Sequence, residues 1–136
     1  MRQECAKRAT KARVTPRTYA LEYLGRGRPG EDLGARIEIT EKGVVFVGEY
    51  TPGLHPAGTV VVALNDNTVT SGRGGHCRVW LSDGQVVVGD CGSDNGTWIA
   101  RDGKTKRVGT ERSPDVVLPG SDLYVGACRL RLVESR

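Results

Sequence analysis

The sequence predicts an all-β fold: an antiparallel β-sandwich of roughly ten to eleven short strands with no substantial helix. Three observations lead to this expectation. The strand-like runs are short, the gaps between them carry Gly, Pro, Asn or Asp, and several runs alternate apolar with polar residues. Turn signals at such close spacing are typical of sandwiches, because each strand has to reverse direction after a few residues.

Ten strands are expected from residue 19 onward. Their ranges are 19–24, 36–40, 44–48, 59–64, 76–81, 85–90, 97–100, 116–118, 123–125 and 128–133. Within 76–81, Cys77, Val79 and Leu81 alternate with His76, Arg78 and Trp80. The stretch 128–133 alternates apolar residues with arginines in the same way. Since successive side chains of a strand point to opposite faces, one face of each strand is expected to lie in the core.

The basic character of the chain is concentrated at its N-terminus. Residues 1–17 carry six Lys or Arg and one Glu, so 14 cations and 15 acids remain and residues 18–136 have a net charge of −1. Without apolar periodicity, residues 1–17 are predicted to form a disordered basic arm ahead of one domain at 18–136. A mitochondrial-type presequence and a basic nuclear address stay open. Nucleic-acid binding is therefore not expected of the domain, and would fall to the arm.

Several classes of protein are excluded by what the chain lacks. No apolar run approaches the ~20 residues that span a bilayer, so we expect an intracellular protein, cytoplasmic or nuclear, with an organelle left open. The four cysteines are Cys5, Cys77, Cys91 and Cys128, and none forms a Cys-x-x-Cys pair. This spacing indicates buried thiols in a reducing compartment and no zinc or other metal site.

No cofactor and no catalytic activity are expected. The loop at 25–30 spells Gly-x-Gly-x-x-Gly, but Pro29 and strand sequence follow it, whereas a dinucleotide site needs a helix there. We interpret it as a surface loop whose arginines could contact an acidic partner. His55 and His76 are the only imidazoles, and neither lies in a recognisable nucleophile, metal or paired-carboxylate pattern. Ser93 lacks the Gly-x-Ser-x-Gly elbow of a hydrolase.

The stretch 71–99 carries the strongest functional signal. A loop of small and cationic residues precedes the strand at 76–81, and a polar turn built around Asn95-Gly96 follows the strand at 85–90. Adjacent strands can bring these two loops together on one rim of the sandwich. Hydroxyl, guanidinium and amide groups with free backbone N–H groups are suited to holding an anion or an extended peptide.

These residues resemble a forkhead-associated (FHA) domain, a β-sandwich family that binds phosphothreonine peptides. Asp90, Ser93, Asn95, Gly96 and Thr97 resemble the family's Asp-x-x-Ser-x-Asn-Gly-Thr segment, and His76 fits its histidine after the Ser-Arg loop. Residues 118–126 and 43–49 resemble two further strand segments of the family. The resemblance covers roughly residues 18 to 135.

The resemblance implies a non-catalytic module that binds a threonine-phosphorylated protein or peptide. Asn95 and Gly96 are then expected to contact the peptide, with the Asn95 amide on its main chain, since an amide both donates and accepts hydrogen bonds. Thr97 is expected either to brace the loop or to reach the phosphate. Ser71 and Arg73 are the candidate phosphate ligands, because a hydroxyl and a guanidinium offer charge-assisted donors.

The remaining roles and the departures from the family bear on the same loops. His76 and Ser93 are expected to shape the loops as scaffold residues. Glu49 stands where the family has a phosphate-binding arginine, and Arg73, not a serine, lies three residues before His76. A carboxylate beside a phosphate repels it. The alternative function is therefore an FHA-like module that binds a protein partner, or a second copy of itself, without phosphate, with Trp80, Trp98 and Arg78 as anchors.

Overall fold

A computed structural model describes residues 17–27, 29–72 and 74–135, and within them the chain forms eleven strands and no helix. The strands are β1 (Thr18–Gly25), β2 (Arg36–Ile39), β3 (Val44–Val47), β4 (Val61–Ala63), β5 (Cys77–Ser82), β6 (Gln85–Asp90), β7 (Thr97–Arg101), β8 (Lys104–Arg107), β9 (Asp115–Val117), β10 (Asp122–Val125) and β11 (Cys128–Ser135). Nowhere in this part of the chain is there a helix able to cross a membrane.

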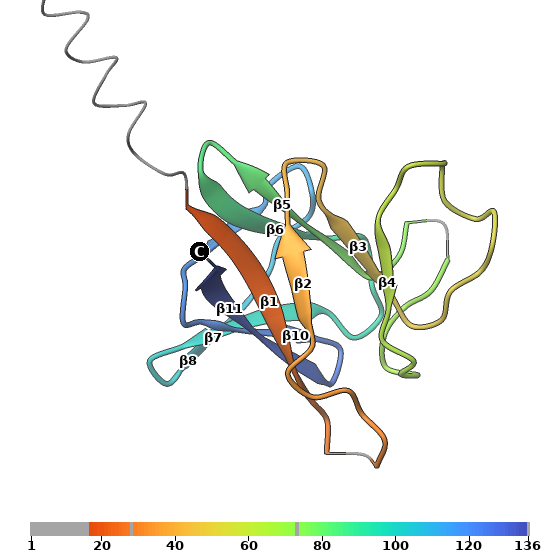
Figure 1. Cartoon of the computed structure of the whole chain (residues 1–136), viewed down its shortest axis with the longest axis horizontal. Coiled ribbons are helices and arrows are strands. Elements are labelled where there is room, and N and C mark those ends of the chain that lie inside the picture. The colour runs from red at the N-terminus through yellow and green to blue at the C-terminus, as the bar shows by residue number, and fades with distance from the viewer. Residues whose placement is uncertain (1–16, 28, 73, 136) are drawn as a thin grey trace, which may run out of the picture.

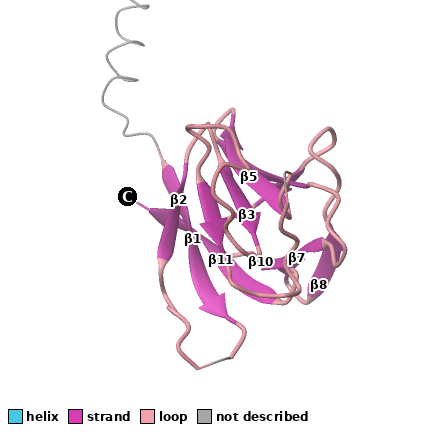
Figure 2. Cartoon of the chain, turned by 90° about the vertical axis from the view of Figure 1, so that its right-hand side faces the viewer, coloured by secondary structure: helices cyan, strands magenta, loops and turns pink. Residues whose placement is uncertain are grey.

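The strands form two packed sheets, which Figures 1 and 2 show from perpendicular directions. One sheet has six strands in the order β2-β1-β11-β10-β7-β8, and the other has five in the order β4-β3-β5-β6-β9. The predicted all-β sandwich is thus confirmed. The first and last strands, β1 and β11, pair antiparallel over most of their length inside the six-stranded sheet.

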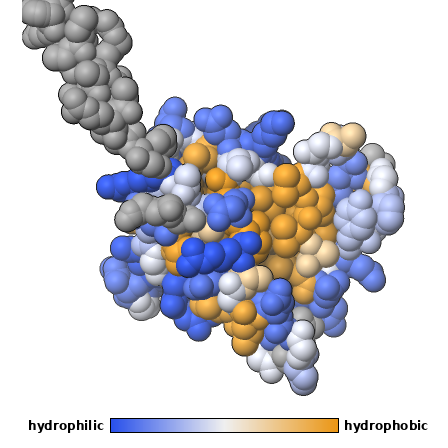
Figure 3. Space-filling view, viewed as in Figure 1, coloured by the Kyte–Doolittle hydropathy of each residue, from blue (hydrophilic) through white to orange (hydrophobic). Residues whose placement is uncertain are grey.

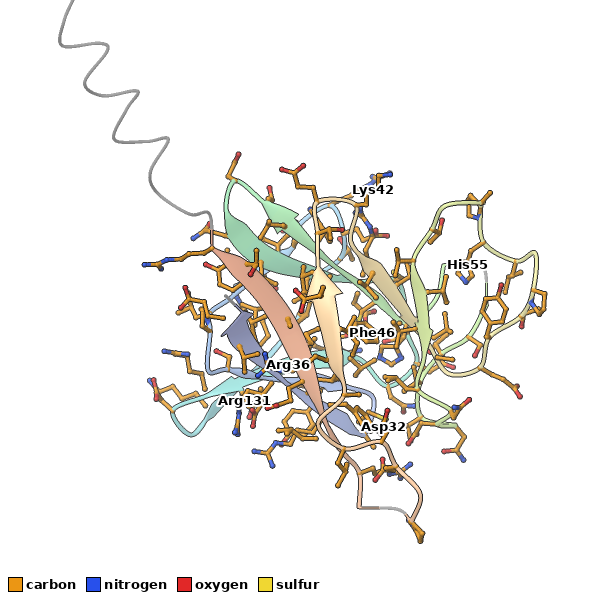
Figure 4. All side chains as sticks on the ribbon, viewed as in Figure 1. Asp32, Arg36, Lys42, Phe46, His55 and Arg131 are labelled. Carbon is orange, nitrogen blue, oxygen red and sulfur yellow. The ribbon has the colours of Figure 1, made fainter. Side chains whose placement is uncertain are left out.

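The core lies between the sheets and is built by the alternation that the sequence shows. Cys77 and Val79 of β5 and Leu130 and Leu132 of β11 are buried, as expected from their alternation with polar neighbours. Phe46 of β3, labelled in Figure 4, is also fully buried. Burying a large apolar side chain stabilises a fold by about 1.5–3 kcal/mol, so these alternating residues hold the two sheets together.

Two features of the topology differ from the expectation. No strand was expected between residues 100 and 116, but this charged segment contains the edge strand β8, which pairs antiparallel with β7. Its four residues are all exposed, so β8 has no apolar alternation by which it could be recognised. Strand β4 pairs parallel with β3 and not antiparallel, and the long connection at 48–60 allows this, because a parallel neighbour cannot be reached by a tight hairpin.

Two of the two-residue hairpin loops of the fold are Asp-Gly pairs. Asp83 and Gly84 join β5 to β6, Asp102 and Gly103 join β7 to β8, and all four have positive φ. Positive φ at both central residues is the requirement of a type I′ turn, which matches the twist of the flanking strands. Asn95-Gly96 differs, because Gly96 has a φ of 81° while Asn95 has no positive φ. This pair therefore belongs to a wider loop and not to a type I′ hairpin.

One side of the sandwich, between the edge strands β2 and β4, is open. Figure 3 shows apolar surface there, surrounded by polar residues. A hollow of about 540 Å³ at this side is lined by Tyr23, Ala35, Ile37, Val62, Leu64 and neighbouring residues. The expected basic arm lies outside the described residues except for Arg17, whose Nε lies 3.3 Å from the Glu134 carboxylate.

Candidate functional site

The loop between β6 and β7, residues 91–96, is held in shape by the carboxylate of Asp90. Its Oδ1 accepts hydrogen bonds from the hydroxyls of Ser93 at 2.6 Å and Thr97 at 2.7 Å. Its Oδ2 accepts from the backbone N–H groups of Gly92 at 2.9 Å and Ser93 at 2.8 Å. Burial works to raise the pKa of this carboxyl, but the four donors outweigh it and hold the pKa below its usual range.

Ser93 and Thr97 both serve this carboxylate. Ser93 Oγ also accepts a hydrogen bond from the backbone N–H of Gly96 at 2.9 Å, which closes the loop on itself. Thr97 is fully buried and its hydroxyl is engaged by Asp90. The expectation that Thr97 contacts a bound peptide is therefore corrected, because a buried hydroxyl has no access to a ligand. The bracing role, which was the other expectation for this residue, fits the geometry.

His76 joins the two loops from inside the protein. Its side chain is fully buried, Nδ1 accepts a hydrogen bond from the backbone N–H of Thr70 at 2.8 Å, and Nε2 lies 2.8 Å from the carbonyl oxygen of Gly96. A nitrogen that accepts from N–H carries no proton, and one that faces a carbonyl must donate, so the ring is neutral with its proton on Nε2. This geometry suits the scaffold role expected of His76.

Further hydrogen bonds cross directly between the loops. Asn95 Nδ2 donates to the carbonyl oxygen of Thr68 at 2.9 Å, and the backbone N–H of Asp94 donates to Thr70 Oγ1 at 3.2 Å. Among the described residues, 64–72, 74–76 and 91–96 therefore form one rim at the end of β5 and β6. Asn95 is exposed, and its Oδ1 accepts no hydrogen bond from the part of the chain that the structure describes. One amide oxygen and one amide hydrogen of Asn95 remain available to a ligand.

Ser71 lies on the same rim, beside Glu49. The backbone N–H of Glu49, two residues after β3, donates to Ser71 Oγ at 2.7 Å, so the hydroxyl is held in place and keeps its own hydrogen for a ligand. Close packing under Ser71 depends on Gly48, where an added Cβ would lie 2.2 Å from the carbonyl oxygen of Val69. Arg73, the other phosphate candidate, lies outside the described residues.

An ion pair beside the rim was not foreseen. Asp66 has a fully buried carboxylate, and Arg26 Nη1 lies 3.0 Å from each of its oxygens. Arg26 comes from the glycine-rich loop after β1, so this arginine meets an acidic group of its own chain. Asp66 Oδ1 also accepts from the backbone N–H of Thr68 at 2.8 Å. The Asp66-x-Thr68 spacing is typical of a turn in which a carboxylate caps its own backbone, and this was the available signal.

Acidic groups surround the recess next to Ser71. The recess has a volume of about 330 Å³ and is lined by Gly48, Glu49, Asn65, Asp66, Asn67, Val69 and Ser71. Burial acts to raise the pKa of the Asp66 carboxyl, but hydrogen bonds from Thr68 and Arg26 lower it by more. The net pKa is below its usual range, so the group is ionised at neutral pH. Glu49 is exposed at the mouth of the recess. An anion seated here needs more positive charge than Arg26 supplies.

Solved structures with the same architecture are FHA domains. The FHA domain of the CT664 protein of Chlamydia trachomatis is similar over 88% of this chain and 99% of its own, with 17% identity and a TM-score of 0.60. The FHA domain of an Arabidopsis thaliana protein is similar over 88% of this chain and 87% of its own, with 16% identity and a TM-score of 0.64. A third structure, from work on phosphothreonine-dependent FHA domain interactions, is similar over 88% of this chain and 98% of its own, with 13% identity and a TM-score of 0.59.

Sequence comparison gives no further support for a family assignment. No protein-family model and no curated protein matches the chain. Structural similarity at 13–17% identity establishes the architecture of the main chain and leaves the ligand to be argued from the side chains. The similarity covers 88% of the chain with TM-scores of 0.59–0.64, so the chain has the fold of a forkhead-associated domain.

Proposed function

We propose that this domain is a non-catalytic protein-interaction module that binds a phosphothreonine-containing peptide across the rim of residues 64–76 and 91–96. In this proposal Ser71 and Arg73 hold the phosphate, and Asn95 bonds the peptide main chain. Gly96 was also expected to contact the peptide, but it is buried and its backbone N–H and carbonyl are bonded to Ser93 and His76. It shapes the Asn95 corner instead, through a φ of 81° that is unfavourable for other residues. His76, Ser93, Thr97 and Asp90 hold the loops in position and do not contact the ligand.

The observation that carries the proposal is the pair of exposed polar groups on one braced rim. Asn95 presents an amide oxygen and hydrogen, and Ser71 presents a hydroxyl hydrogen, while the groups beneath them are satisfied inside the protein. A preorganised rim loses little conformational entropy when a peptide binds. One of the similar structures comes from work on phosphothreonine-dependent interactions, which supports this choice of ligand.

Glu49 is the main opposition to phosphate. A phosphate with two negative charges ~5 Å from this carboxylate would be repelled by about 2 kcal/mol in water and about 6 kcal/mol at an effective dielectric of 20. The exposed position of Glu49 favours the lower figure. Arg73 therefore has to supply the attraction that an arginine at position 49 would otherwise give.

Binding to a pair of peptide libraries tests the proposal. A degenerate phosphothreonine library should be retained by the domain and its unphosphorylated twin should not, and Arg73→Ala and Asn95→Ala should each abolish retention. Asp94→Ala is the matched control, because Asp94 is exposed on the same loop and contributes only its backbone N–H to the rim. Glu49→Arg should strengthen phosphopeptide binding at least about 30-fold, which corresponds to removing about 2 kcal/mol of repulsion.

A second candidate function is docking of an unphosphorylated protein or a second copy of this chain. Two observations favour it: carboxylates line the recess beside Ser71, and apolar residues line the hollow between β2 and β4. Equal retention of both peptide libraries, together with unchanged binding by Glu49→Arg, would support this function and reject phosphate recognition. Sedimentation over a range of concentrations distinguishes self-association from docking of another protein.

A further inference from the structure

A row of aromatic and cationic residues crosses the outer face of the six-stranded sheet. Arg129 of β11 lies opposite Tyr124 of β10, Tyr124 lies opposite Trp98 of β7, and Trp98 lies opposite Arg107 of β8. Directly paired residues on antiparallel strands have Cβ atoms about 4.5–5.5 Å apart, so the four side chains are neighbours. The next residues along these strands, such as Leu123 and Leu130, are fully buried, which places the row on the face turned away from the core.

The end of the row at β8 presents an uncompensated cation over an aromatic ring. The guanidinium carbon of Arg107 lies 5.5 Å from the centroid of the Trp98 ring. Among the described residues, no carboxylate lies within ion-pair distance of Arg107, and Arg107 is exposed. Trp98 is half-buried, and its Nε1 donates to the carbonyl oxygen of Asn95 at 3.3 Å, which fixes one edge of the ring.

The other end of the row carries two further arginines that share one acid. Arg129 Nη2 lies 2.7 Å from Asp122 Oδ2, and Arg131 Nε lies 2.9 Å from Asp122 Oδ1. About two fifths of each arginine side chain remains exposed, so each guanidinium can also donate to a second anion. Figure 4 labels Arg131 on this sheet, together with Arg36 on β2. With Glu22 of β1, which lies directly opposite Arg131, the outer face around the row has three cations and two acids, a net charge of about +1.

We infer that this row binds single-stranded nucleic acid. Bases stack on the rings of Tyr124 and Trp98, and the phosphates lie against Arg107 at one end and Arg129 and Arg131 at the other. Tyr124 and Trp98 are each partly exposed, and aromatic rings flanked by cations are the arrangement that retains unpaired bases with little dependence on their sequence. Rings can stack only on bases that are unpaired, which favours single strands over duplexes. This inference does not depend on the proposed peptide site.

The opposite sheet contains a similar pair without the same surroundings. Arg78 lies over Trp80 with 4.6 Å between its guanidinium carbon and the ring centroid. The neighbours of Trp80 in its row are Val87 and Val116, which give no second ring. Arg78 Nη2 donates to the carbonyl oxygen of Lys42 at 2.8 Å. This pair is therefore a matched control: the same residue types, also on a strand, where no stacking platform continues.

Fluorescence anisotropy of a labelled 15-nucleotide oligothymidylate, measured with the full chain at 50 mM salt, tests the inference. Residues 1–17 are strongly basic and attract any polyanion, so the comparison of variants decides the result. Trp98→Leu, Tyr124→Leu and Arg107→Gln should each weaken binding about fivefold or more, since base stacking on one ring is worth about 1–3 kcal/mol. Trp80→Leu and Arg78→Gln should change it less than twofold.

Salt dependence and competition give the remaining readouts. Each phosphate contact contributes about −0.7 to the slope of log affinity against log salt for single strands, so Arg107→Gln should reduce the slope by about that amount. Arg107→Gln changes an exposed side chain and keeps the fold, which makes it informative even if a Trp98 variant unfolds. A phosphothreonine peptide library in excess should not displace the oligonucleotide, because the two ligands are proposed to bind different surfaces.

Three outcomes would overturn the inference. The first is no measurable binding by the intact chain at 50 mM salt. The second is equal loss of affinity in the variants of both sheets, or displacement by heparin with no effect of the aromatic variants, because binding would then be attraction of a polyanion without stacking. The third is that an acidic peptide binds through Trp98 and Arg107 while the oligonucleotide does not, which would make the face a protein-docking surface.

Discussion

Replacing Asp90 by asparagine should loosen the rim from beneath without touching any proposed ligand contact. The carboxylate accepts four hydrogen bonds, two from hydroxyls at Oδ1 and two from backbone N–H groups at Oδ2. An asparagine has one oxygen and one NH₂ group in their place. Whichever way the amide is turned, two of the four hydrogen-bond donors lose their acceptor and face the amide NH₂ group, which is itself a donor.

The expected loss follows from the number of bonds. Hydrogen bonds to a charged acceptor contribute about 1.5–3 kcal/mol each, and since Asp90 is partly exposed we take the lower value for both lost bonds, about 3 kcal/mol in total. For a domain of this size such a loss lowers the midpoint of thermal unfolding by roughly 10 °C. Urea unfolding followed by tryptophan fluorescence measures it directly. Asp94→Asn, on the exposed side of the same loop, should stay within about 0.5 kcal/mol of the wild type.

The pH dependence supplies a second, independent check on Asp90. Its pKa is lowered in the folded state, so its contribution to stability is fully present above the unfolded value of about 3.9 and is lost as the pH falls through the folded value. The stability difference between the wild type and Asp90→Asn should therefore be constant from pH 7 to about pH 5 and shrink below pH 4. A difference under 1 kcal/mol at pH 7, or one that grows in acid, would refute the role given to this carboxylate.

Three further predictions concern groups around the rim. His76→Ala should destabilise the domain by about 3 kcal/mol or more in urea unfolding, because two buried backbone groups lose their partner and a cavity forms; a loss below 1 kcal/mol would contradict its scaffold role. Gly48→Ala should cost at least about 2 kcal/mol, whereas Gly74→Ala, whose Cβ would meet its nearest atoms at 3.8 Å, should cost less than about 1; equal effects would mean that the packing under Ser71 is not tight. Burial and Glu111 raise the pKa of Cys91 to about 12, so its alkylation at pH 8, followed by peptide mass spectrometry, should be at least about a hundredfold slower than that of a free thiol, and Glu111→Gln should accelerate it; rapid alkylation of the wild type would show that the thiol is not shielded.

Much of the fold could be predicted because it follows from local patterns. The alternation of Cys77, Val79 and Leu81 identified a strand with one face in the core, and the spacing of turn residues indicated a sandwich. Strand β8 could not be found in this way, because its residues Lys104–Arg107 are all exposed and only the pairing with β7 makes them a strand. The parallel pairing of β4 with β3 likewise depends on the path of a long connection and not on residue type.

The candidate site divides along the same line. Ser71 and Asn95 could be selected because polar residues cluster at two loops next to recognisable strands, while His76 and Ser93 were selected through the resemblance to the FHA family. Their roles could not be separated, because the sequence does not specify whether the Thr97 hydroxyl is exposed to solvent or buried against Asp90. The pairing of Arg26 with Asp66 joins residues 40 positions apart and has no counterpart in the local pattern.

The sequence by itself determined ten of the eleven strands, the polar loops and the resemblance to a phosphopeptide-binding family, because alternation and turn chemistry act between residues that are close in the chain. Only the tertiary structure decided which hydroxyls are buried braces and which are exposed, and that Arg129, Tyr124, Trp98 and Arg107 form one row. Burial and cross-strand neighbours depend on how distant strands pack and pair, and no local pattern specifies them.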